Sequence, residues 1–70
     1  MKIGDRITFS GSYTVYDPDT KQTRIELNVI LRSGIILDLK EETIEVFSND
    51  EFCHLPRSSK GCIIHDIAEI

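Results

Sequence analysis

The chain has 70 residues, of which 40% are hydrophobic and 29% are charged, and its formal net charge is −4 at neutral pH. These fractions are typical of a folded soluble domain and exclude a disordered chain. The acidity disfavours a protein that binds nucleic acid by neutralising phosphates with a basic face. We expect one small domain over residues 1–70, which buries only about 60% of its unfolded surface and would gain stability from a disulfide, a metal or self-association.

The sequence shows no apolar run of about 18 residues and no basic segment followed by an apolar one. We therefore expect neither a membrane span nor a secretory signal, and a cytoplasmic protein whose thiols stay reduced.

The first predicted strand follows a turn at residues 3–5. Side chains alternate between the two faces of a strand, so the alternating apolar residues should face inward. These residues are Ile7, Phe9, Tyr13 and Val15. Gly11 falls in the same series, and a glycine inside a strand marks a bulge or a sharp bend. A turn follows at residues 17–20, with Pro18 suited to its second position and Asp17 able to accept a bond from the backbone beyond it.

Residues 23–40 alternate again and predict two strands folded back on each other. A three-residue loop at residues 32–34 gives the register that pairs apolar side chains: Leu31 with Ile35, Val29 with Leu37, and Leu27 with Leu39. On the other face it pairs opposite charges: Arg24 with Glu42, and Glu26 with Lys40. Gly34 would then adopt a positive φ. The same register leaves Ile30 opposite Ile36 on an otherwise polar face.

Beyond a turn at residues 41–42, we expect a strand at 43–47 with Ile44 and Val46 inward, a turn at 48–50, and a strand at 52–55 that Pro56 closes. A polar loop follows at residues 57–61. Residues 62–70 fit either a helix, by the spacing of Ile63, Ile67 and Ile70, or a strand, by their β-branched side chains. We expect a strand with a tight turn near His65.

Five short strands with turns at roughly eight-to-twelve-residue intervals predict an all-β protein, a small five-stranded SH3-like barrel of antiparallel strands. Three segments support a resemblance: Gly4-Asp5-Arg6-Ile7-Thr8-Phe9, then Leu31-Arg32-Ser33-Gly34 followed by Leu39-Lys40-Glu41-Glu42, and finally Ile67-Ala68-Glu69-Ile70. They resemble the small SH3-like and Sm-like barrel proteins of Gram-positive bacteria and their phages. The resemblance implies a fold and no particular activity.

The residues that might bind a metal are Cys53, His54, Cys62 and His65. Adjacent residues of a strand point to opposite faces, and structural zinc sites need two spaced pairs, so we expect no metal and no cofactor. Two buried, reduced cysteines are expected, with a Cys53–Cys62 disulfide as the alternative.

His65 with Asp66 suggests acid–base chemistry, and Ser58 and Ser59 are possible nucleophiles. No spacing in the sequence brings a base to a nucleophile, so we expect no enzymatic activity.

The sequence favours a protein-interaction module, such as a small regulator or inhibitor of the kind carried by phages or mobile elements, that binds a protein partner and self-associates. Its expected interface is the Ile30 and Ile36 pair with Tyr16 nearby. The alternative is that a strongly bent sheet turns both isoleucines into the core.

An acidic stretch offers a second partner surface. Its candidate residues are Asp38, Glu41, Glu42 and Glu45. They form either a solvated edge or a surface for a basic partner. The alternative function is a nucleic-acid-binding barrel that uses Arg57 and Lys60, with Tyr13 or Tyr16 as stacking platforms.

Overall fold

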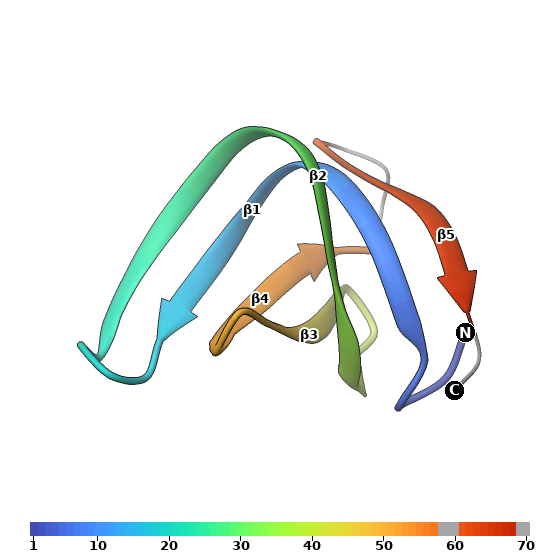
Figure 1. Cartoon of the computed structure of the whole chain (residues 1–70), viewed down its shortest axis with the longest axis horizontal. Coiled ribbons are helices and arrows are strands. Elements are labelled where there is room, and N and C mark those ends of the chain that lie inside the picture. The colour runs from blue at the N-terminus through green and yellow to red at the C-terminus, as the bar shows by residue number, and fades with distance from the viewer. Residues whose placement is uncertain (58–60, 69–70) are drawn as a thin grey trace.

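The computed structural model describes residues 1–57 and 61–68, without the side chains of Asp66 and Ala68. Five antiparallel strands make up its regular structure (Figure 1). They are β1 (Arg6–Asp17), β2 (Gln22–Leu39), β3 (Thr43–Ser48), β4 (Glu51–Pro56) and β5 (Cys62–Ala68). The predicted all-β class is confirmed, and the described residues form no helix.

The predicted hairpin within residues 23–40 is wrong, because these residues belong to one continuous 18-residue strand. Strand β2 pairs antiparallel with β1 along its length, from Asp17 opposite Gln22 to Arg6 opposite Ile35. The hairpin is therefore β1–β2, and its turn is the one expected after Asp17. The backbone amide of Asp19 donates to the Asp17 carboxylate across 2.9 Å, as the sequence predicted.

Gly34 lies in the middle of β2 and does not adopt the positive φ expected of a loop residue. The reason for a glycine here is space. A Cβ on Gly34 would lie 2.5 Å from Val46 Cγ1 and 2.6 Å from the Phe47 carbonyl oxygen. Only a residue without a side chain lets β2 approach β3 this closely.

Strands β1 and β2 bend sharply together at the top of Figure 1. The register shifts on both sides of Gly11, and each time β2 contains one more residue than β1. Gly11 has φ +111°, and a Cβ there would overlap the Gly61 carbonyl oxygen. Asn28, in one of the β2 bulges, also has a positive φ. The bulge predicted at Gly11 is confirmed. The bend lets the two halves of each strand lie in different parts of the sheet.

Ten buried apolar side chains form the core, and they come from all five strands. They are Ile7, Phe9, Tyr13, Val15, Ile36, Ile44, Val46, Cys53, Leu55 and Cys62. The inward residues predicted for β1 and β3 are confirmed. Ile36 is fully buried. Its amide donates to the Asp5 carbonyl, and its carbonyl accepts from the Gly4 amide.

The pairings β1–β2, β2–β3, β3–β4 and β4–β1 follow one another in a circuit. Strand β5 pairs with the first half of β1. The expectation of a strand after residue 61 is confirmed. Its tight turn near His65 is wrong: β1 residues Thr8 and Phe9 pair with Asp66 and Ile64, so His65 is the extra residue of a bulge. Ile70 lies outside the described residues.

Candidate interaction surface

Three charged side chains in the first half of β2 share a face with the core residues of β1. Directly opposed residues of an antiparallel pair lie on the same face. Arg32 is opposite Phe9, Glu26 is opposite Tyr13, and Arg24 is opposite Val15. Ile25, Leu27 and Leu31 are therefore turned over relative to the sequence prediction, whereas Val29 packs against the core as predicted.

These inward polar residues form an ion network centred on Glu51, at the start of β4. The Glu51 carboxylate accepts from both terminal nitrogens of Arg24, at 2.5 and 2.9 Å, and from Arg32 at 3.0 Å. Arg24 also donates to Glu26 across 2.6 Å. Hydrogen bonds from Arg24 lower the pKa of Glu51 to about 2 despite partial burial, with further lowering by Arg32. The predicted pairs of Arg24 with Glu42 and of Glu26 with Lys40 do not form.

The Arg32 side chain is only 12% exposed, and its remaining donors are satisfied by buried neighbours. It donates to the Ser48 hydroxyl and carbonyl, at 2.9 and 2.8 Å, and to the Tyr13 hydroxyl at 3.3 Å. The Ser48 hydroxyl in turn donates to the Ser33 carbonyl across 2.6 Å. Burial raises the pKa of Tyr13, and the Arg32 hydrogen bond opposes that rise. No buried side-chain polar atom of the described residues is without a hydrogen-bond partner, so the network is internally satisfied and stabilises the fold.

Because Arg24, Glu26 and Arg32 lie on the core side of the sheet, four apolar residues in the same part of β2 point into solvent. Ile25, Leu27, Ile30 and Leu31 are 69%, 68%, 91% and 62% exposed. Ile63 of β5, opposite Ser10 of β1, is 56% exposed. We call these five residues the outer apolar face.

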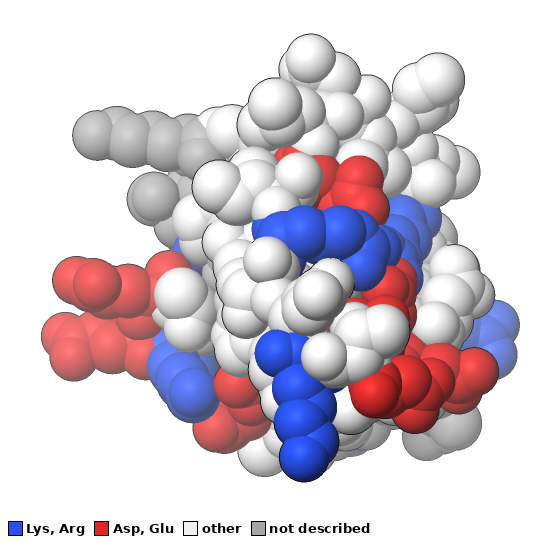
Figure 2. Space-filling model, turned by 90° about the vertical axis from the view of Figure 1, so that its left-hand side faces the viewer, with Lys and Arg blue, Asp and Glu red and all other residues white. Residues whose placement is uncertain are grey.

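Between the β2 residues of this face and Ile63 lie three small, hydroxylated residues of β1: Ser10, Ser12 and Thr14. Thr14 is opposite Ile25, and the Ser12 hydroxyl accepts from the Asn28 amide at 3.4 Å. In Figure 2 the uppermost part of the molecule, where β1 and β2 bend in Figure 1, shows no Lys, Arg, Asp or Glu among its described residues. On the side that Figure 2 shows, the described part of this bend is thus free of Lys, Arg, Asp and Glu as well as exposed.

The structure separates the three residues predicted to form an interface. Ile30 lies on the outer apolar face, whereas Ile36 is in the core, so the predicted Ile30–Ile36 pair is wrong. Tyr16 is half-buried and stacks on Phe52, with ring centroids 6.4 Å apart. Phe52 also packs against Phe47, with ring centroids 5.5 Å apart. Tyr16 therefore belongs to an aromatic row across β1, β4 and β3.

The predicted acidic surface is partly neutralised. Glu45 lies 3.3 Å from the Lys40 ammonium and 3.4 Å from His54 Nδ1. Asp38 accepts from the Leu39 amide at 2.9 Å. Glu41 and Glu42 are exposed.

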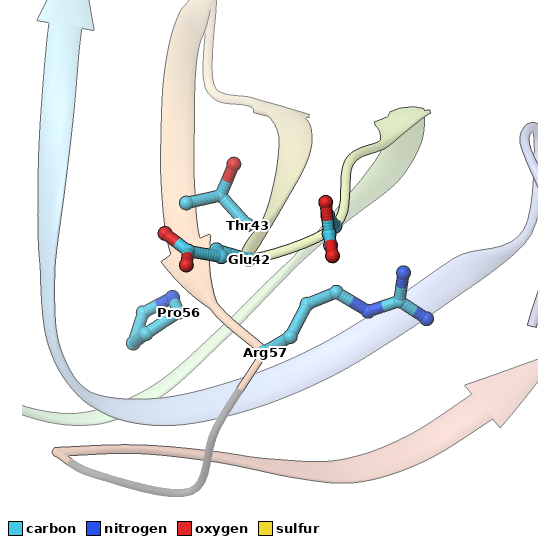
Figure 3. A pocket seen from close by; sticks show the side chains of 5 residues that line it. Glu42, Thr43, Pro56 and Arg57 are labelled. Carbon is cyan, nitrogen blue, oxygen red and sulfur yellow. The ribbon is translucent and has the colours of Figure 1, made fainter.

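Glu41 and Glu42 line an open pocket together with Thr43, Pro56 and Arg57 (Figure 3). The Arg57 guanidinium donates to the Lys40 carbonyl across 2.8 Å, and its amide donates to the Glu42 carbonyl. Arg57 is thus held beside two acids and forms no basic face with the described residues around it. Lys60, its expected companion in nucleic-acid binding, lies outside the described residues.

The candidate metal residues do not come together. Cys53 and Cys62 are free and buried, and burial raises the pKa of both thiols. His54 is near Glu45, while His65 Nε2 is 2.5 Å from the Ser10 hydroxyl oxygen. Among the described residues, no three metal-binding side chains form a group.

Ser10 and His65 are the one pairing of nucleophile and base that the described hydrogen bonds include. Both lie on an open strand surface, and the pocket in Figure 3 is lined by other residues. Of the catalytic residues considered from the sequence, Ser58, Ser59 and the Asp66 side chain lie outside the described part of the chain.

Comparisons with protein-family models, curated proteins and solved structures found no match for this chain. The described part of the chain contains no helix long and apolar enough to cross a membrane. The geometry of the described residues is therefore the basis for a functional argument.

Proposed function

We propose that this chain is a non-enzymatic protein-interaction module that binds a protein partner through the outer apolar face. One observation carries the proposal: four large aliphatic residues of a single strand, Ile25, Leu27, Ile30 and Leu31, are each more than 60% exposed. Soluble monomers scatter exposed apolar residues singly, and a contiguous patch marks an association site.

The scaffold we propose is a small SH3-like barrel. The circuit of pairings among β1, β2, β3 and β4 supports it, as do the sharp bend at Gly11 and the close approach at Gly34. Such a scaffold gives the outer apolar face a rigid backing. A rigid face lowers the conformational entropy lost on binding. We therefore propose a small regulator or inhibitor, of the kind carried by phages, that acts by binding its protein partner.

Charge favours a protein partner over nucleic acid. The net charge is −4, and the uncharged outer face offers no cation to a phosphate. Arg57, the residue expected to lead nucleic-acid binding, is beside Glu41 and Glu42.

Site-specific photo-crosslinking tests the proposal. A photoreactive benzoylphenylalanine replaces Leu27 on the outer apolar face or, as a matched control, Ile3, which is 61% exposed near the N-terminus. After irradiation in the native host, position 27 should give protein adducts on a denaturing gel and position 3 should not. Equal adduct yields at both positions, or none at position 27, would contradict the proposal.

A further inference from the structure

We infer that the partner on the outer apolar face is a second copy of this chain, packed face to face in a homodimer. This inference rests on the proposed function and assigns its partner. Four features support it: the composition of the face, its area, the small core, and the backbone of β2.

The composition is that of a homodimer interface. Four β2 residues on one side and Ile63 on the other flank Ser10, Ser12 and Thr14 of β1, and none of these described residues is charged. Homodimer interfaces are more apolar than transient ones, and their centres are depleted of charge. Two copies can join here although each has a net charge of −4, because the face itself contributes no charge to the contact.

The area that two copies can bury on this face approaches what a specific dimer needs. Full burial of one Ile or Leu side chain removes roughly 100 Å² of apolar surface from water. At the observed exposures of 56–91%, the five side chains of one copy offer about 350 Å², and two copies about 700 Å². The half-buried serines and threonine between them add to this area. Stable specific interfaces begin at about 1,200 Å² in total.

The core alone is small. The described residues include ten buried apolar side chains, and as many large hydrophobic residues remain exposed. A domain of about 60–70 residues buries too little surface to be strongly stable by itself, and self-association is a common remedy. Five of the exposed residues gather on this one face, where a second copy covers them together.

The backbone of β2 favours packing of faces over pairing of edges. Among the described residues, β2 pairs with β1 alone between Gln22 and Gly34, so its other edge is open there. The two bulges within residues 26–32 interrupt that edge. Bulges prevent a second strand from extending the ladder. The side chains of the outer apolar face, and not the backbone of β2, should therefore make the contact.

Sedimentation velocity on the purified full chain, over a roughly hundredfold concentration range, tests the inference. The wild type should sediment as a dimer. Ile30→Lys and Leu27→Lys should each raise the dimer dissociation constant at least about tenfold, with an unchanged circular dichroism spectrum. Ile3→Lys, an equally large change at a 61% exposed isoleucine, should leave the dimer intact. Should a lysine variant unfold, the milder Ile30→Ser and Leu27→Ser variants make the same test.

A wild type that stays monomeric at every concentration overturns the inference, and so does a dimer that neither face variant weakens. The photo-crosslinks then separate this failure from that of the proposed function. Adducts from position 27 to a different protein leave the interaction module standing with another partner. A monomeric protein that also gives no adducts at position 27 would contradict both the homodimer and the interaction module.

Discussion

Replacing Glu51 by glutamine should destabilise the protein at neutral pH and change how its stability depends on acid. The Glu51 carboxylate is 17% exposed and accepts from two arginines, of which Arg32 is 12% exposed. Glutamine keeps the size of the side chain and removes its charge. Arg32 would retain its bonds to Ser48 and Tyr13 but lose its carboxylate partner.

The magnitude follows from the lowered pKa. A carboxyl whose pKa falls from 4.5 to about 2 on folding stabilises the folded state at neutral pH by up to about 3 kcal/mol. Arg24 is 43% exposed, so solvent screens its share of the network. We therefore expect Glu51→Gln to cost roughly 1–2 kcal/mol. Because the folded pKa is the lower one, this contribution is complete above about pH 4.5 and disappears as the pH falls towards 2.

Urea unfolding of wild type and Glu51→Gln from pH 7 to pH 2 measures this directly. The two stability curves should lie about 1–2 kcal/mol apart at pH 7 and converge below about pH 3. Glu41→Gln, the same chemical change at an exposed residue, should follow the wild type. A constant gap at all pH values, or equal stability at pH 7, would refute the role assigned to the network.

Four other substitutions or reactions test the fold. Gly34→Ala should lower the free energy of unfolding by about 1–3 kcal/mol in urea titrations, because its Cβ would lie 2.5 Å from a side-chain atom of β3. An unchanged value would mean that β2 and β3 do not approach so closely there. Gly11→Ala should cost at least as much, because φ is +111° and its Cβ would overlap the backbone before β5. The thiols of Cys53 and Cys62 should react with iodoacetamide at least about tenfold more slowly in the folded than in the denatured protein, as rapid native labelling would contradict their burial. Ile36→Lys should abolish the folded circular dichroism spectrum; a folded variant would show that this residue is not core.

Much of the fold was predictable because its signals are local. The inward residues of β1, the turn after Asp17, the bend at Gly11 and the inward pair of β3 were all assigned correctly. Each depends on alternation next to an unambiguous turn, or on a glycine where a side chain belongs.

Residues 23–40 could not be assigned, because a period of two shows that a strand has two different faces but not which of them faces the core. The usual rule places apolar side chains inside, and here it fails for Ile25, Leu27 and Leu31. Ser33-Gly34 resembles a turn, and a strand of 18 residues is far longer than the average of about five or six. Gly34 serves instead the close approach to β3, which no local pattern reveals.

The ion network was equally hidden. The sequence offers Arg24 an opposite charge nearby, Glu42, and the predicted register paired these two residues. The actual partner of Arg24 and Arg32, Glu51, is 27 and 19 residues away and becomes adjacent only through the β3–β4 hairpin. The sequence placed Ile30 outside the core, where it lies on the outer apolar face. It also placed Ile36 beside Ile30, and that prediction was wrong.

The most direct test of the outer apolar face is a set of isotope-filtered nuclear Overhauser effects between methyl-labelled and unlabelled copies of the protein, mixed at a concentration where they associate. We expect intermolecular contacts that join the methyl groups of Ile25, Leu27, Ile30, Leu31 and Ile63 across the two copies. Intermolecular contacts that instead join methyl groups away from this face, such as those of Ile3 or Leu37, or the absence of any such contacts, would contradict the account.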